Sequence, residues 1–134
     1  MGSASLVIVT AVNRGLVTAG IILVLASNVT AKGYKWYCVY TQRASPEGLV
    51  KDDDFKLEFG YDDLTGKAVL IGNNGVADVD VHLGYGSATF MEKLNSGVVQ
   101  TTTVSKNGVS VHSRHTILRG EMVPTQYYGQ CKIQ

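Results

Sequence analysis

Residues 73–83 read NNGVADVDVHL, and this stretch decides the fold class. Its second half places apolar residues at odd positions and polar residues at even ones: Ala77, Val79, Val81 and Leu83 against Asp78, Asp80 and His82. A period of two is typical of a strand with one buried and one solvated face. Asn73-Asn74-Gly75 precedes this strand, and an Asn-Gly pair suits the positive φ angles of a type I′ turn. The stretch therefore predicts a hairpin, with residues 67–72 as its first strand.

The same alternation recurs on both sides of this hairpin. Short β-branched and aromatic runs are separated by Gly, Asn, Asp and Ser turns, and they predict strands over residues 34–41, 55–61, 67–72, 76–83, 88–94, 98–104, 109–118 and 126–133. Residues 44–54 contain Pro46, Gly48 and an aspartate run, so we expect a solvated loop there. Residues 120–124 are expected to interrupt the pattern before the last strand.

These segments indicate an all-β domain, a small antiparallel meander of seven to eight strands. An up-and-down barrel is the first interpretation, and a β-sandwich is the alternative. An immunoglobulin-type sandwich places its Trp between two cysteines, whereas Trp36 precedes both Cys38 and Cys131. In a barrel, a bond between these cysteines would join the first strand to the last and so remove the open edges of the sheet.

Residues 1–31 differ from the rest of the chain. Residues 15–27 carry no charge and follow Arg14, and a small-x-small pattern ends at Ala31. A basic region, an apolar stretch and such an exit are the parts of a secretory signal peptide, cleaved after Ala31 or, as a second choice, after Ala26. The alternative is an uncleaved N-terminal membrane anchor over Ser5–Ser27, in which Arg14 would cost about 2.5–3.5 kcal/mol at mid-membrane. Either interpretation predicts an apolar helix, followed by a single β domain at residues 32–134.

Cys38 and Cys131 are the two cysteines of the chain and lie near the two ends of the β domain. Such a pair in an exported domain predicts a disulfide. Closing so long a loop is worth about 4–5 kcal/mol in the chain-entropy description. The cysteines therefore favour an oxidising compartment, periplasmic or extracellular, or a membrane-anchored domain that faces one.

Residues 110–116 form the densest polar segment, SVHSRHT. His112 and Arg114 share one strand face and His115 lies on the other, so His112 and Arg114 are the weak candidates for a binding site. An Arg fork suits carboxylate or phosphate groups. The competing interpretation for Arg114 is an ion pair with a carboxylate of this chain: Asp78, Asp80 or Glu92.

Metal binding and catalysis have weaker support. A metal site would combine His112 with His82 or with the aspartates of residues 78–80, yet no paired-His motif is present. Ser113 stands beside His112 and His115 in sequence only, and no nucleophile elbow or P-loop occurs. We therefore expect no cofactor, no metal and no enzymatic activity.

Tyr127 and Tyr128 are further weak candidates for binding, because Tyr combines apolar area with a hydroxyl group. The alternative is that one ring packs inside the barrel and its neighbour covers the rim. For the threonine run at residues 101–103, we expect cross-strand pairing.

Composition limits the classes of function. Hydrophobic residues make up 45% and the net charge is +1, which argues against disorder and against a nucleic-acid-binding domain. The expectation is an exported, non-enzymatic β-barrel that binds a protein partner or a small ligand. The alternative is an accessory subunit of a membrane complex, held by an uncleaved N-terminal transmembrane helix.

Overall fold

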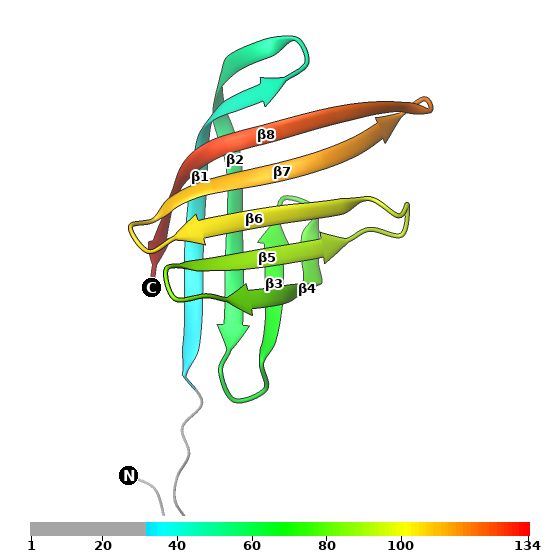
Figure 1. Cartoon of the computed structure of the whole chain (residues 1–134). Coiled ribbons are helices and arrows are strands. Elements are labelled where there is room, and N and C mark those ends of the chain that lie inside the picture. Colours follow the sequence, from blue (N-terminus) through cyan, green and yellow to red (C-terminus); the bar gives the residue numbers. More distant parts are fainter. Residues whose placement is uncertain (1–31) are drawn as a thin grey trace, which may run out of the picture. The chain divides into compact units, whose positions relative to one another are not determined.

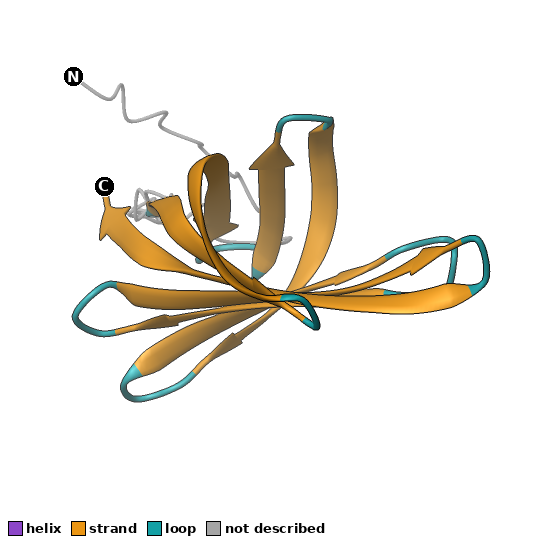
Figure 2. Cartoon of the chain, turned by 90° about the horizontal axis from the view of Figure 1, so that it is seen from above, coloured by secondary structure: helices purple, strands orange, loops and turns teal. Residues whose placement is uncertain are grey.

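The computed structural model describes residues 32–134, which form eight strands in one closed sheet (Figure 1). In chain order the strands are β1 (Gly33–Ser45), β2 (Gly48–Asp62), β3 (Lys67–Gly72), β4 (Gly75–Leu83), β5 (Ser87–Lys93), β6 (Val99–Ser105), β7 (Val109–Leu118) and β8 (Glu121–Ile133). Seen from above, the drawn strands are joined by short turns alone (Figure 2). In this part of the chain no helix is long and apolar enough to cross a membrane. The predicted N-terminal helix, signal peptide and membrane anchor fall outside the described residues.

Each strand pairs antiparallel with the next, and β8 pairs with β1 to close the barrel. This arrangement confirms the up-and-down barrel and excludes the β-sandwich. Cys38 and Cys131 lie directly opposite each other in the β1–β8 register and form a disulfide across 93 residues of sequence. We call the β1–β8 strand pair, which closes the barrel, the seam. The disulfide joins its two strands covalently, as the sequence predicts.

Aromatic side chains fill one half of the barrel interior. Phe59 and Phe90 stack with their ring centroids 4.2 Å apart, and Trp36 meets Phe90 edge-on at 5.2 Å. All three are buried, because their strands point alternate residues inward. The β6–β7 turn packs against the seam in the same half, where the amide of Cys131 donates to the carbonyl of Gly108 at 2.7 Å.

Two expected irregular segments are strands, and both predictions were wrong. β1 continues to Ser45 and β2 begins at Gly48, so only residues 46–47 remain of the loop expected at 44–54. Here Arg43 pairs with Val50 in register, and its Nε lies 3.9 Å from Asp52 Oδ2. These cross-strand contacts extend the β1–β2 hairpin through a polar sequence.

The second correction concerns residues 120–124, of which residues 121–124 belong to β8. Arg119 and Gly120 both have positive φ, so they make the tight two-residue turn between β7 and β8. Pro124 is tolerated in the strand because β1 pairs with β8 only from Gln126 onward, which leaves that side of Pro124 without a neighbouring strand.

The β3–β4 hairpin forms where it was predicted, with Gly72 opposite Gly75. Its turn type was wrong, however. A type I′ turn needs positive φ at both central residues, and of the residues in this turn only Gly75, with φ 115°, has it. The threonine run pairs as expected, since the Thr89 and Thr103 hydroxyls hydrogen-bond across β5 and β6 at 2.9 Å.

Candidate functional site

Alternation along β7 sends its polar residues to opposite sides of the barrel wall. His112 and Arg114 point toward the interior, and His112 is only 2% exposed. His115 is exposed on the outer surface, and so is His82 on β4. The shared face of His112 and Arg114 is therefore confirmed, and both belong to the inside of the barrel.

His112 sits in an aromatic enclosure. Its ring centroid lies 5.3 Å from that of Phe55 and 5.9 Å from that of Tyr127. Nδ1 is 2.6 Å from the Thr102 hydroxyl on β6, while Nε2 is buried without a hydrogen-bond partner. Burial, assisted by the positive charge of Arg114, lowers the pKa of His112 from 6.5 to about 4. The imidazole is therefore neutral at physiological pH.

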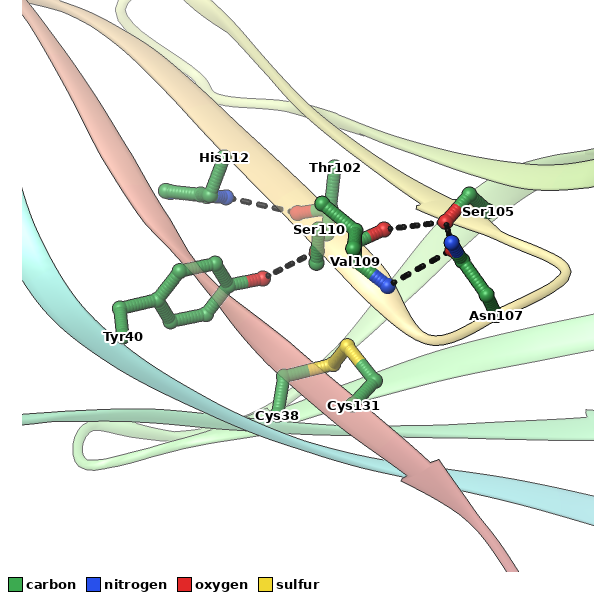
Figure 3. The surroundings of a disulfide bond; sticks show 9 residues. All are labelled: Cys38, Tyr40, Thr102, Ser105, Asn107, Val109, Ser110, His112 and Cys131. Carbon is green, nitrogen blue, oxygen red and sulfur yellow. Dashed lines mark hydrogen bonds between the residues drawn. A yellow bond between two sulfur atoms is a disulfide. The ribbon is translucent and has the colours of Figure 1, made fainter.

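A second buried hydrogen bond lies beside the first (Figure 3). The Tyr40 hydroxyl on β1 and the Ser110 hydroxyl on β7 are 3.0 Å apart. Burial raises the pKa of Tyr40 to about 12, against the opposing effect of its hydrogen bonds to Ser110 and Thr102. Together these side chains form a polar layer across the middle of the barrel, next to the disulfide.

Beyond this layer the interior opens. A cavity of about 550 Å³ lies at the end of the barrel that carries the β3–β4 turn. Its walls are largely apolar side chains and turn backbone: Phe55, Leu57, Leu70, Gly72, Asn73, Asn74, Gly75, Val76, Ala77 and Leu94. Among the described residues, the lining also includes Glu92, Gln100 and Arg114.

Glu92, Gln100 and Arg114 form one row across three consecutive strands. Glu92 of β5 is directly opposite Gln100 of β6, and Gln100 is directly opposite Arg114 of β7. The row lies one inward position beyond Phe90, Thr102 and His112, because inward residues recur every second position along a strand. We call these three residues the polar row.

The expected ion pair of Arg114 is not formed. Among residues 32–134, no salt bridge of 4.0 Å or less joins its guanidinium to Asp78, Asp80 or Glu92, and Asp80 instead lies 2.6 Å from Lys93. The Arg114 Nε is buried and has no hydrogen-bond partner. Arg114 is thus a cation that faces a cavity with part of its hydrogen-bonding capacity unused.

The two C-terminal tyrosines separate as the alternative interpretation predicts. Tyr127 is buried and packs on Phe55 at a centroid distance of 4.2 Å. Tyr128 lies on the other face of β8, where its hydroxyl donates to Gln126 Oε1 at 2.8 Å. Tyr127 therefore supports the wall near His112, and Tyr128 belongs to the outer surface.

The structure does not bring together the side chains considered for metal binding or catalysis. His112 is inside the barrel, whereas Asp78, Asp80 and His82 are exposed on its outside. Within the described part of the chain, no group of three His, Cys, Asp or Glu side chains is arranged to hold a metal ion. Ser113 lies on the face of β7 opposite to His112, where its hydroxyl accepts a hydrogen bond from Gln126 Nε2 at 3.3 Å.

Sequence reasoning missed Gln100, Phe55 and the role of Glu92 as parts of this site. Residues two positions apart on a strand share one face. Glu92 follows Phe90 by two positions and Gln100 precedes Thr102 by two positions, so the sequence could have placed each pair on the same face. Their alignment with Arg114 depends on the pairing register, which no single segment reveals.

The β7–β8 hairpin offers a different kind of surface. Beyond Arg114, residues 115–118 of β7 pair with β8 and not with β6. Ile117 and Met122 are opposite each other in this two-stranded arm and are 51% and 59% exposed. The arm reaches past the paired part of the sheet at the right of Figure 1.

The chain matches no protein-family profile, no curated protein and no solved structure.

Proposed function

We propose that this protein is an exported, non-enzymatic β-barrel that binds a small ligand through an anionic group of that ligand, in the cavity at the open end of the barrel. The observation that carries the proposal is Arg114, whose Nε is buried without a partner at the wall of a cavity of about 550 Å³. Small-molecule sites are commonly concave, largely apolar and 300–1,000 Å³ in volume, with a few convergent polar groups.

The chemistry of Arg114 favours a carboxylate or phosphate group. A buried donor without an acceptor is unfavourable by about 1–3 kcal/mol, and the guanidinium that carries this donor lines the cavity, where an anion would give it a counter-charge. The planar guanidinium fork binds such groups through two parallel hydrogen bonds. The apolar walls, including Phe55 and Leu57, suit a ligand whose remaining body is hydrophobic.

The buried disulfide between Cys38 and Cys131 supports export, because such bonds persist in oxidising compartments. We propose a signal peptide over residues 1–31 and a mature N-terminus at Lys32. N-terminal sequencing and intact mass of the protein from its native soluble and membrane fractions test this point. A retained Ser5–Ser27 segment in the membrane fraction would instead support the accessory subunit of a membrane complex.

The binding proposal is tested by titrating the protein with 3-phenylpropanoate, which has one carboxylate and an apolar body. Arg114→Gln should weaken binding by about tenfold or more, since a hydrogen bond to a charged group contributes about 1.5–3 kcal/mol. Arg119→Gln is the matched control, because Arg119 is exposed in the β7–β8 turn. Equal affinity of the wild-type protein and Arg114→Gln would refute the assignment of Arg114.

A second candidate function is protein binding through the β7–β8 arm. Its support is the exposure of Ile117 and Met122 on a two-stranded hairpin, which is a marginally stable unit in water when uncovered. Co-purification from the native compartment, compared between the wild-type protein and Ile117→Ser, tests it. A partner whose recovery is unaffected by Ile117→Ser would argue against the arm.

A further inference from the structure

We propose that the ligand of this cavity is a small zwitterion with an apolar body, such as an α-amino acid, whose amine binds Glu92 and whose carboxylate binds Arg114. This inference rests on the proposed function and narrows its ligand to one chemical class. It is carried by the polar row, in which a carboxylate and a guanidinium face one cavity from β5 and β7 with the Gln100 amide between them.

The two charged side chains of the polar row do not pair with each other. Neighbouring strands are about 4.8 Å apart, so the backbones of Glu92 and Arg114, separated by β6, are about 10 Å apart. No ion pair joins these two side chains. Both charged groups are therefore left for a ligand that carries an ammonium and a carboxylate group.

The charges near the polar row are few among the residues that the structure describes. Glu92 and Arg114 are the two charged residues among the described residues that line the cavity. On the adjacent β1–β2 hairpin, Arg43 and Asp52 face each other at 3.9 Å. The nearest titratable group below the row, His112, is neutral because it is buried. The described lining of the cavity therefore presents one carboxylate and one guanidinium to a ligand.

The floor of the cavity limits the length of the ligand. Below the polar row, Phe59, Phe90, Thr102 and His112 pack so closely that the space between them does not admit a water molecule. A long acyl chain consequently has no path into the barrel. A compact body that rests against Phe55 and Leu70 fits the remaining space.

The chemistry of the row matches such a ligand group by group. The Glu92 carboxylate only accepts hydrogen bonds and suits an ammonium group, whereas the Arg114 guanidinium only donates and suits a carboxylate. Gln100 has both an acceptor and donors, so it can bond to either end of the ligand. A neutral or singly charged ligand would leave one charged side chain in the cavity without a counter-charge.

Three probes that share a phenyl ring separate these possibilities by calorimetric titration of the full-length, oxidised protein. They are L-phenylalanine, 3-phenylpropanoate, which lacks the amine, and 2-phenylethylamine, which lacks the carboxylate. We expect L-phenylalanine to bind about tenfold or more tightly than either analogue, because each charged contact is worth at least that factor.

Two variants assign the ends of the ligand. Glu92→Gln should lower the affinity for L-phenylalanine by about tenfold and leave the affinity for 3-phenylpropanoate unchanged or higher. Arg114→Gln should lower the affinity for both probes. Glu58→Gln is the matched control, since Glu58 pairs with Lys35 at 3.3 Å and does not line the cavity. Circular dichroism of each variant verifies that the barrel remains folded.

The outcomes distinguish the two proposals. One outcome is that the wild-type protein binds 3-phenylpropanoate as tightly as L-phenylalanine, with only Arg114→Gln lowering the affinity. In that case the zwitterion proposal is wrong, and the proposal that Arg114 binds an anionic group is retained. If Glu92→Gln raises the affinity for L-phenylalanine, Glu92 competes with the ligand carboxylate for Arg114, and the zwitterion proposal is again wrong. If none of the three probes binds, both proposals are overturned.

Discussion

Acidification from pH 7.5 to pH 5 should destabilise the barrel by about 2 kcal/mol through His112 alone. The imidazole is enclosed by Phe55 and Tyr127, and its pKa falls from 6.5 in the unfolded chain to about 4 in the folded protein. Between these two values the unfolded state binds a proton that the folded state excludes. The contribution of His112 to stability is therefore complete above pH 6.5 and is lost progressively as the pH falls toward 4.

The magnitude follows from the width of that interval. One pH unit within it corresponds to about 1.4 kcal/mol, so the 1.5 units between pH 6.5 and pH 5 give about 2 kcal/mol. The full interval down to pH 4 gives about 3 kcal/mol. His112 is 2% exposed, so screening by solvent does little to reduce these figures.

Urea unfolding at pH 7.5, 6 and 5 measures the effect as a difference between the wild-type protein and His112→Asn. Asparagine has a short amide that can still bond to Thr102 but has no proton to gain, and the subtraction cancels the contributions of the carboxylates. His82→Asn is the control, because His82 is exposed on the outer surface. If the free energies of unfolding of the wild-type protein and His112→Asn change in parallel with pH, the conclusion that the His112 imidazole is buried and neutral is wrong.

Three further perturbations test the seam and its surroundings. Replacing both Cys38 and Cys131 by Ala should lower the free energy of unfolding by about 2–5 kcal/mol, and non-reducing peptide mapping should recover the two cysteines in one linked peptide. Two thiols that alkylate freely in the native protein would contradict this bond. Tyr40→Phe should cost about 1–2 kcal/mol in urea unfolding because it leaves the buried Ser110 hydroxyl without its partner, whereas Tyr37→Phe, at an exposed position, should be neutral. Gly129→Ala should cost about 1–3 kcal/mol or more in thermal unfolding, because its Cβ would lie 2.6 Å from the Tyr40 Cα; Gly33→Ala meets no atom within 4 Å and serves as the control.

The sequence predicted those parts of the fold that depend on local pattern. Alternation over residues 76–83 placed Val79 and Val81 on the inner face, and the positions of Cys38 and Cys131 indicated which strands meet at closure. The extensions of β1–β2 and β7–β8 were missed, because the polar composition of residues 44–54 and Pro124 argue locally against strands. Cross-strand partners such as Val50 for Arg43 outweigh that local preference.

The candidate site was predicted only in part, for a similar reason. The period of two on β7 placed His112 and Arg114 on one face, but it does not say that this face is the interior. Whether Arg114 meets a carboxylate depends on the registers of β5 with β6 and of β6 with β7 together. A one-residue slip in either register would turn Glu92 or Gln100 to the outer surface.

Because β8 pairs with β1, the eight strands form a closed cycle of neighbours, and the chain is interrupted only between β8 and β1. Lys35 and Gln134 exchange backbone hydrogen bonds, with the Gln134 amide donating to the Lys35 carbonyl at 2.9 Å, so the two ends of the barrel's chain meet there. A circular permutant that joins Gln134 to Lys32 and opens the chain at Pro46 would keep every strand pair. In that permutant, Cys38 and Cys131 would belong to one hairpin, and their bond would close a loop of roughly ten residues. Its entropic contribution would fall by about 2 kcal/mol, since that contribution grows with the logarithm of loop length.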